Sequence, residues 1–299
     1  MKIMTFFSEK GGVGKSSFAI MYASWLGHRH GVKVGLADYN DRIYGYRKAE
    51  IRNREELIGL NPNAGIKPYD EEKTWPIVRA TMRERNMLVR EGRIAPNAAW
   101  LENEITGQDG RLRDMDVVIC DFPGSLTGKE FIEVASADML GLVVIPVEKD
   151  EMTLQSTLRL HSALKKGSWA ENINYCVFLN RAELNLNSVK RGFQALGPIL
   201  VRKGLPMLPD IVSRSERMAQ IDKVDNIRST FGFPDFDSPE YGKSKDLGIE
   251  NLFIDITRLL DKSPDFRGTA ETDLSFARAM VKRNDGRQFR GSAFPDFEI

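Results

Sequence analysis

Glycines alternate with cationic and hydroxyl side chains near the start of the chain, where the run from Lys10 to Ser17 reads Lys-Gly-Gly-Val-Gly-Lys-Ser-Ser. Closely spaced glycines let backbone N–H groups turn inward around phosphate oxygens. In such a loop Lys15 can reach the β- and γ-phosphates, and the hydroxyl of Ser16 can bind Mg²⁺. The run therefore predicts an ATP and Mg²⁺ site formed by Gly11, Gly12, Val13, Gly14, Lys15, Ser16 and Ser17.

The elements that must position this loop are a strand before it, at residues 3–7, and a helix after it, at 16–26. Such a helix directs its positive end at bound phosphates. Further continuous apolar runs predict strands, and such runs are typical of a parallel sheet covered on both faces. With helices between the strands, the pattern predicts a doubly wound α/β fold, a mainly parallel sheet flanked by helices. The other predicted strands are 32–37, 115–120, 140–147, 173–179 and 205–211, and the predicted helices between them are 153–164 and 188–203.

Polar residues follow three of these strands directly, namely Asp38, Asp121 and Asn180. The carboxyl ends of parallel strands lie at one edge of a sheet, and ligands bind beyond that edge. We therefore expect these three side chains to lie near the glycine loop.

The remaining stretches are less regular. Residues 44–114 are highly charged and contain four prolines, with a possible strand at 75–80 and a basic helix at 79–93. After residue 234 the pattern predicts two extra C-terminal helices, at 249–260 and 272–281, and a loose tail from 284. We expect a nucleotide-binding domain over 1–262 and a C-terminal part, residues 263–299, packed on it or extending from it.

Composition excludes several classes of protein. The 299 residues carry a net charge of +1, so a nucleic-acid surface requires local clustering of cations. The two cysteines lie in predicted strands and form neither a disulfide framework nor a four-ligand metal site. The longest apolar run, 139–147, is far shorter than the about 20 residues of a membrane-spanning helix. We expect a cytoplasmic protein.

Lys10 lies five positions before Lys15, which is the spacing of the deviant Walker A motif. The chain thus resembles the ParA/MinD family of dimerising P-loop ATPases. The resemblance implies an ATP-dependent homodimer in which Lys10 reaches the phosphates bound by the partner, so that hydrolysis is coupled to dimerisation. Glu9 stands where the commonest phosphate loop has a glycine.

The resemblance also implies roles for residues at the strand ends. Asp121 matches the Walker B aspartate, and the following Phe-Pro-Gly, which ends at Gly124, is similar to the family's switch II. Asp38 matches the first aspartate of switch I, so the implied Mg²⁺ ligands are Ser16, Asp38 and Asp121. The implied catalytic residues are Lys10, Lys15, Asp38, Asn40 and Asp121, and the residues implied around the adenine are Asn180, Arg181 and Pro209.

Asn40 departs from the family pattern, in which a second aspartate of switch I positions the attacking water. Asparagine can hydrogen-bond a water molecule but cannot accept its proton. The substitution predicts slow hydrolysis or a long-lived ATP dimer.

Three uses of the ATPase stay open. The first is partition or positioning of DNA or another cargo, stimulated by a ParB-like partner, with non-specific DNA binding in the ATP state and hence association with the nucleoid. The second is a nucleotide-gated scaffold that hardly hydrolyses ATP, and the third is an ATP-dependent ligase. The chain lacks the basic C-terminal helix by which MinD-type proteins bind membranes, so we expect no membrane partner. The predicted DNA contacts are Arg202, Lys203, Arg214 and Arg217, with further basic clusters within 79–93 and 282–290.

Overall fold

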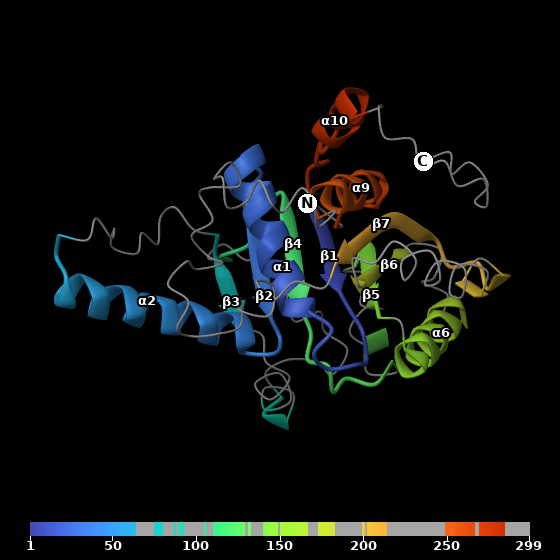
Figure 1. The fold of residues 1–299 in the computed structure, drawn as a ribbon, viewed down its shortest axis with the longest axis horizontal. Coiled ribbons are helices and arrows are strands. Elements are labelled where there is room, and N and C mark those ends of the chain that lie inside the picture. Colours follow the sequence, from blue (N-terminus) through green and yellow to red (C-terminus); the bar gives the residue numbers. More distant parts are fainter. Residues whose placement is uncertain are drawn as a thin grey trace.

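A parallel sheet forms the centre of the protein (Figure 1). The chain starts at a central strand, fills one side of the sheet and then the other, so that the direction of the crossovers changes beside that strand. This is the predicted doubly wound α/β fold. From edge to edge, the seven strands are β3 (Ile77–Arg79), β2 (Val34–Asp38), β4 (Val117–Asp121), β1 (Lys2–Phe6), β5 (Leu142–Val147), β6 (Asn174–Ala182) and β7 (Met207–Ser213).

The computed structural model describes most of the chain but not all of it. The described residues are 1–63, 75–79, 87, 90–92, 105, 110–128, 131–132, 140–148, 150–166, 173–182, 199–200, 202–213, 249–266 and 269–284.

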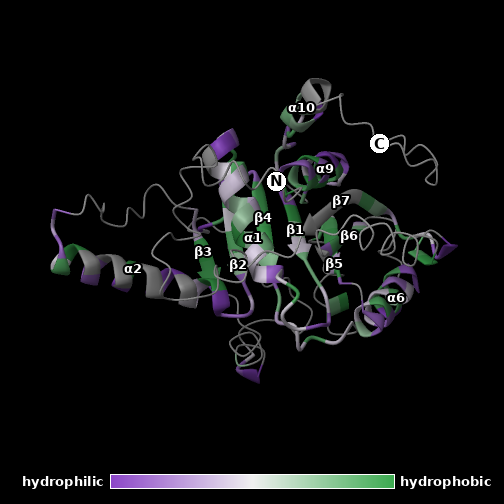
Figure 2. Cartoon of the chain, in the orientation of Figure 1, coloured by the Kyte–Doolittle hydropathy of each residue, from purple (hydrophilic) through white to green (hydrophobic). Residues whose placement is uncertain are grey.

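Each central strand contributes side chains to two hydrophobic cores. In β4, Val117 and Ile119 face one core, whereas Val118 and Cys120 face the other. This explains why the strand sequences are continuously apolar, and Figure 2 shows them as the most hydrophobic part of the described chain. The first core also contains side chains from α1 (Lys15–Ser24), α9 (Ile249–Lys262) and α10 (Phe276–Asn284), and the second contains side chains from α6 (Glu151–Lys166).

Helix α2 (Arg42–Leu60) was not predicted, since its residues lie in the stretch that we expected to be irregular. Its first turn packs on the sheet through the buried Ile43, and the rest of the helix extends away from the sheet (Figure 1). The sequence of α2 has no continuous apolar stripe, which removes the usual signal of a helix. Arginine, lysine, glutamate, alanine and leucine nevertheless favour helix.

Two other predicted helices begin or end elsewhere. The helix after the glycine loop changes to π-helical geometry at Trp25–Arg29. Helix α10 begins at Phe276 rather than at residue 272, and before it the N–H groups of Thr272 and Leu274 donate to the carboxylates of Asp265 and Asp261. The predicted helices at 79–93 and 188–203 lie mostly outside the described residues, as does the tail after 284.

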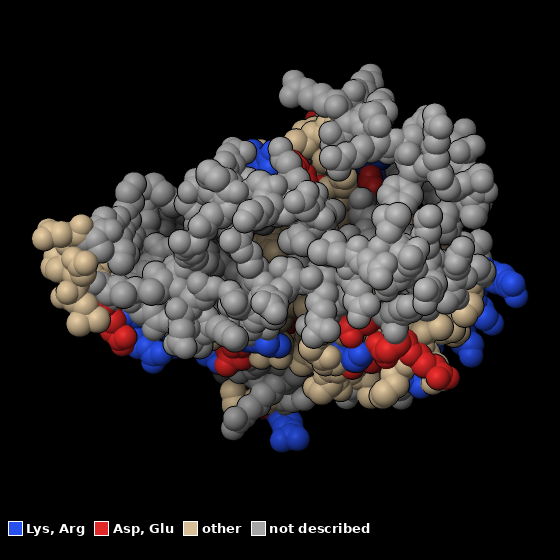
Figure 3. All heavy atoms as spheres, viewed as in Figure 1, with Lys and Arg blue, Asp and Glu red and all other residues tan. Residues whose placement is uncertain are grey.

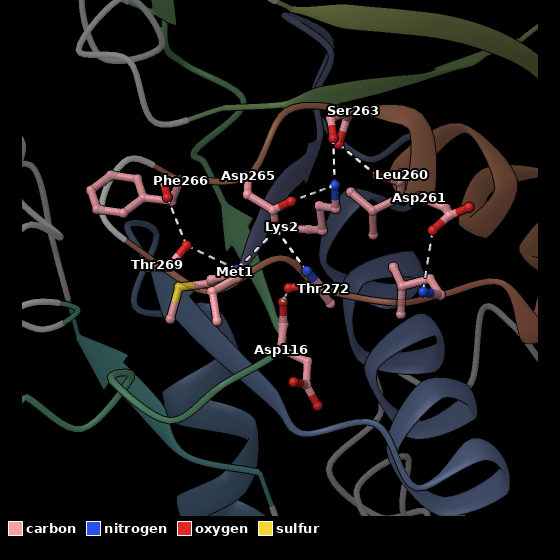
Figure 4. Close-up of polar contacts among 12 residues, drawn as sticks. Met1, Lys2, Asp116, Leu260, Asp261, Ser263, Asp265, Phe266, Thr269 and Thr272 are labelled. Atoms are coloured by element: carbon pink, nitrogen blue, oxygen red, sulfur yellow. Dashed lines mark hydrogen bonds and ion pairs between the residues drawn. The ribbon is translucent and has the colours of Figure 1, made fainter.

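The segment after α9 is fastened to the start of β1 (Figure 4). The buried ammonium of Lys2 lies 2.9 Å from Oδ2 of Asp265 and donates to the carbonyl of Ser263 at 2.5 Å. The amino group of Met1 donates to Oδ1 of Asp265 at 2.9 Å, and Phe266 donates its N–H to the Met1 carbonyl at 2.8 Å. These contacts cross the predicted boundary at 262, which stays a prediction.

No helix within the described ranges is both long enough and apolar enough to cross a lipid bilayer.

The Lys2–Asp265 pair should contribute to stability. Burial alone would raise the pKa of Asp265, but hydrogen bonds from Lys2 and Met1 outweigh it and lower this pKa below its usual value. Asp265→Ala leaves the buried Lys2 ammonium without its carboxylate, so we expect the free energy of unfolding to fall by about 3 kcal/mol near neutral pH. Urea denaturation of both proteins measures this difference.

The pH dependence follows from the lowered pKa. The contribution of Asp265 is complete above the pKa of an unfolded aspartate and disappears as the pH falls through the folded value, so the two proteins should converge in acid. Glu271→Ala removes an exposed carboxylate from the same segment and should leave stability nearly unchanged. Equal effects of both substitutions would contradict a specific role for the pair.

Candidate nucleotide-binding site

The glycine loop connects the carboxyl end of β1 to the first turn of α1. Gly12 and Gly14 have φ angles of 78° and 88°, in the left-handed region that side chains disfavour. The carbonyl of Gly14 accepts the N–H of Phe18 at 2.9 Å, so the helix begins directly at Lys15. The loop therefore needs glycine at 12 and 14 for its conformation, and it presents the amino end of α1 to any bound anion.

Lys15 lies buried at the base of this loop. Its ammonium donates to the backbone carbonyl of Lys10 at 2.9 Å. Burial lowers the pKa of Lys15 to about 8, and the nearby Asp121 opposes this shift. A cation held in a largely dehydrated place gains strongly from an approaching anion.

Gly124 lies against the same lysine. A Cβ atom at position 124 would be 2.9 Å from Nζ of Lys15 and 3.2 Å from Cα of Gly11. Glycine at 124 therefore allows the segment after β4 to approach the phosphate loop. The structure thus places Gly124, the end of the segment similar to switch II, at the loop.

Two carboxylates and a hydroxyl meet beside the loop. The Ser16 hydroxyl donates to Oδ2 of Asp121 at 2.7 Å, and Asp38 is the register partner of Asp121 at the ends of β2 and β4. Both carboxylates are almost completely buried. Burial is the main cause that raises the pKa of Asp121 to about 7, and the charge of Asp38 raises it further, whereas hydrogen bonds from Ser16 and Asn40 lower it.

This donor set fits Mg²⁺. Oδ1 of Asp121 is buried and has no hydrogen-bond partner of normal geometry among the described residues. Magnesium is usually bound by one or two carboxylates together with phosphate oxygens and water. The described residues contain no cluster of three or more acidic, histidine or cysteine side chains that could hold a metal by themselves. The site therefore suits a cation that arrives with a nucleotide, held by Ser16 and Asp121 with Asp38 beside them.

The residues after β2 are fixed by their own contacts. The carboxylate of Asp38 accepts the N–H groups of Asn40 at 3.0 Å and of Tyr44 at 2.8 Å, and it thereby holds the start of α2. Burial raises the pKa of Asp38, although these backbone hydrogen bonds oppose the shift. Asp41 has a φ of 59° and forms two hydrogen bonds with Arg79, at 2.6 and 2.7 Å. Arg79 thus binds the Asp41 carboxylate, whereas the Asn40 side chain interacts with Asp121.

Lys10 is bound within its own chain. Its ammonium lies 2.9 Å from Oε2 of Glu148 and 2.9 Å from Oδ2 of Asp150. Asp150 also accepts the backbone N–H of Thr153 at 2.9 Å, so it caps α6. The Asp150 hydrogen bond is the main cause that raises the pKa of Lys10, whose side chain is 35% exposed and therefore within reach of a neighbouring molecule.

Asn180 lies next to the phosphate loop. Its amide donates to the carbonyl of Val13 at 2.9 Å and lies 3.6 Å from the position of a Cβ on Gly14. Arg181 and Pro209 lie in β6 and β7, but their side chains are outside the description. The predicted adenine contacts of these three residues stay predictions.

The predicted DNA-contacting residues are described in part. Arg202 and Lys203 are exposed before β7, and the end of α6 lies beside them because His161 and Lys165 both contact the Lys203 carbonyl, at 2.6 and 3.4 Å. Lys166 is exposed as well. Figure 3 shows basic side chains gathered at this edge of the protein. Arg214 and Arg217 lie outside the described residues.

Sequence reasoning missed three residues of this region. Glu148 and Asp150 were not connected with Lys10, and Lys165 was not connected with Arg202 and Lys203. The acidic pair follows the strand β5, and that position at the carboxyl edge of the sheet was the available signal.

The comparisons with known proteins agree on the fold. No family model matches the sequence, and no curated protein is significantly similar to it. Among solved structures, pNOB8 ParA has a TM-score of 0.55 at 16% identity, over 87% of this chain and 97% of that one. MinD of Aquifex aeolicus has a TM-score of 0.52 at 18% identity, over 89% and 100%. An ATP complex of Cyanothece McdA has a TM-score of 0.52 at 18% identity, over 83% and 96%. The chain thus has the fold of ParA/MinD proteins, as its resemblance to them implied.

The buried carboxylate of Asp121 should destabilise the protein without ligand at neutral pH. Its folded pKa of about 7 lies above the unfolded value, so stability falls as the pH rises from about 4 to about 7. Asp121→Asn removes this charge. We expect the unfolding free energy of the variant at pH 8 to exceed that of the wild type by a few kcal/mol, since one pKa unit corresponds to about 1.4 kcal/mol.

Thermal unfolding without nucleotide across pH 4–8 measures this effect. The difference between the two proteins should shrink toward pH 4. Asp114→Asn, an exposed aspartate shortly before β4, serves as the control and should show no such trend. A wild type that is more stable than Asp121→Asn at every pH would show that the carboxylate is not strained by burial.

Proposed function

We propose that the chain is an ATP-dependent, dimerising ATPase switch that partitions or positions DNA or another cargo, and that it binds DNA non-specifically in its ATP state. The observation that supports this most is the meeting of four groups at one end of the sheet. The Lys15 ammonium, the Ser16 hydroxyl and the carboxylates of Asp38 and Asp121 lie together at the loop formed by Gly11–Gly14. ParA and MinD share the fold, and the similar McdA structure is an ATP complex.

Each group has a role in this proposal. Lys15 and the loop N–H groups bind the phosphates, while Ser16 and Asp121 would hold Mg²⁺. Mg²⁺ supplies positive charge that neutralises the transferred phosphoryl group. Asp38 and Asn40 orient the attacking water beside it. Asp121 must be ionised to bind the cation, and the approaching positive charge favours that form.

Lys10 couples the nucleotide to a second copy of the chain. Within one chain its ammonium is neutralised by Glu148 and Asp150. To reach the phosphates of a partner it must leave these carboxylates, so dimerisation requires a competing negative charge, which the γ-phosphate supplies. The proposal therefore makes the homodimer depend on ATP rather than on ADP.

The proposed DNA surface consists of the basic residues at the end of α6 and before β7. Lys165, Lys166, Arg202 and Lys203 gather there, so a dimer would present two such sets to one duplex. Binding through phosphates alone is independent of sequence and weakens steeply with salt. Arg214 and Arg217 extend this proposal along the chain. A ParB-like partner would then trigger hydrolysis.

Asn40 supports a second candidate, a nucleotide-gated scaffold with little hydrolysis. The Asn40 amide stabilises the charged form of Asp121, but it cannot take a proton from water. An aspartate at this position would add a third carboxylate beside Asp38 and Asp121. An ATP-dependent dimer whose turnover stays negligible in the presence of DNA would favour the scaffold.

Light scattering and DNA retardation together test the proposed function. With ATP and Mg²⁺ we expect a dimer that retards DNA of any sequence at low salt, whereas with ADP we expect a monomer that does not. Lys10→Ala should remain a monomer with ATP. Lys165→Ala/Lys203→Ala should still dimerise but should bind DNA about tenfold more weakly.

The matched control is Lys33→Ala/Lys262→Ala, which removes the same charge from exposed positions on other elements, directly before β2 and at the end of α9. Absence of DNA binding at low salt with ATP would refute the DNA part of the proposal. An unchanged monomer with every nucleotide would refute the dimer.

A further inference from the structure

Glu9 connects the phosphate loop to two other parts of the protein. Its Oε1 accepts the backbone N–H of Gly128 at 2.9 Å, and its Oε2 lies 3.6 Å from the guanidinium of Arg159 in α6. The Glu9 side chain is 22% exposed, so the hydrogen bond is partly shielded from water. The Arg159 side chain is 69% exposed, so this ion pair is the weaker of the two contacts.

The absence of a side chain at Gly128 allows this contact. A Cβ atom at position 128 would lie 2.8 Å from Oε1 of Glu9, which is closer than such atoms approach. The φ angle of Gly128 is not in the left-handed region, so the backbone itself would accept alanine. A side chain at 128 would therefore have to displace the Glu9 carboxylate.

The segment from Gly124 to Gly128 is thus attached to the phosphate loop at both ends. At one end Gly124 lies against Gly11 and the Lys15 ammonium, and at the other end Gly128 is bound by Glu9. This segment begins three residues after Asp121. A γ-phosphate bound by Lys15 would lie next to Gly124, and ADP lacks this phosphate.

We propose that Glu9 is a positioning residue that holds the 124–128 segment in place to contact the γ-phosphate, so that Glu9 sets the preference for ATP over ADP. This inference rests on the proposed binding of ATP at the loop. A segment fixed in advance binds the third phosphate without the cost of ordering, and that advantage is absent for ADP. Glu9 itself does not contact the nucleotide.

Calorimetric titration of ATP and ADP with Mg²⁺ tests this role. For Glu9→Ala we expect ATP to bind about tenfold more weakly, the effect of losing one hydrogen bond to a charged group. ADP affinity should change by less than about twofold. Glu9→Gln keeps an acceptor for the Gly128 N–H and should keep most of the preference for ATP. Glu151→Ala removes an exposed carboxylate nearby on α6 and serves as the control.

Gly128→Ala tests the same contact without changing the loop. Its Cβ would displace the Glu9 carboxylate, so it should reduce the preference for ATP as Glu9→Ala does, and combining the two substitutions should add little. Equal weakening of ATP and ADP in Glu9→Ala, or an unchanged preference in both single variants, would overturn the role of Glu9 while ATP binding by the wild type still stands. A wild type that binds no ATP would overturn both proposals.

Discussion

The hydrogen bond from Ser16 to Asp121 joins the first turn of α1 to the end of β4, and the arrangement of the site depends on it. It can form only because β4 lies directly beside β1 in the sheet, although about 110 residues separate the two strands. On its other side β4 pairs with β2, and this pairing places Asp38, at the end of β2, beside Asp121. A parallel sheet that fills first one side and then the other therefore brings distant polar residues to the glycine loop.

This arrangement has an energetic cost that is informative about function. Two carboxylates are buried side by side, and a lysine with a lowered pKa is buried near them. Folding alone does not favour such a set, because charged groups lose their hydration. A polyphosphate with a divalent cation would pair with both kinds of charge at once, the phosphates with the lysine and the cation with the carboxylates. Unfavourable electrostatics at one place, in an otherwise well-packed protein, is typical of a binding site.

Two charged residues at the start of the loop, Glu9 and Lys10, bind groups outside it. Lys10 is neutralised by residues after β5, and Glu9, its neighbour, is bound by the segment after β4 and by α6. Adjacent residues of opposite charge thus tie the loop to different elements. Both residues thus contact groups on or beside α6, whose far end carries Lys165 and Lys166.

The sequence was sufficient to predict the parts of the site whose signal is local. Gly12, Gly14, Lys15 and Ser16 lie in one run, and Asp38 and Asp121 end apolar strands. The partners of Lys10 and Glu9 could not be predicted, because they depend on which strand ends lie next to the loop in space. Helix α2 was missed because Ile43, in its first turn, is the one fully buried side chain among those described for the helix, and many of its remaining residues have the charges of an exposed stretch.

The central claim is that the loop and the Ser16–Asp121 pair bind ATP together with Mg²⁺. Calorimetric titration of ATP with Mg²⁺ at pH 6.5, in two buffers with different heats of ionisation, tests it most directly. Near its pKa of about 7, Asp121 is partly protonated before binding and must lose its proton to hold the cation. We expect Mg²⁺-dependent binding with net release of protons, and we expect Asp121→Asn to abolish the release. ATP binding that is independent of Mg²⁺ and of Asp121, or no binding at all, would contradict it.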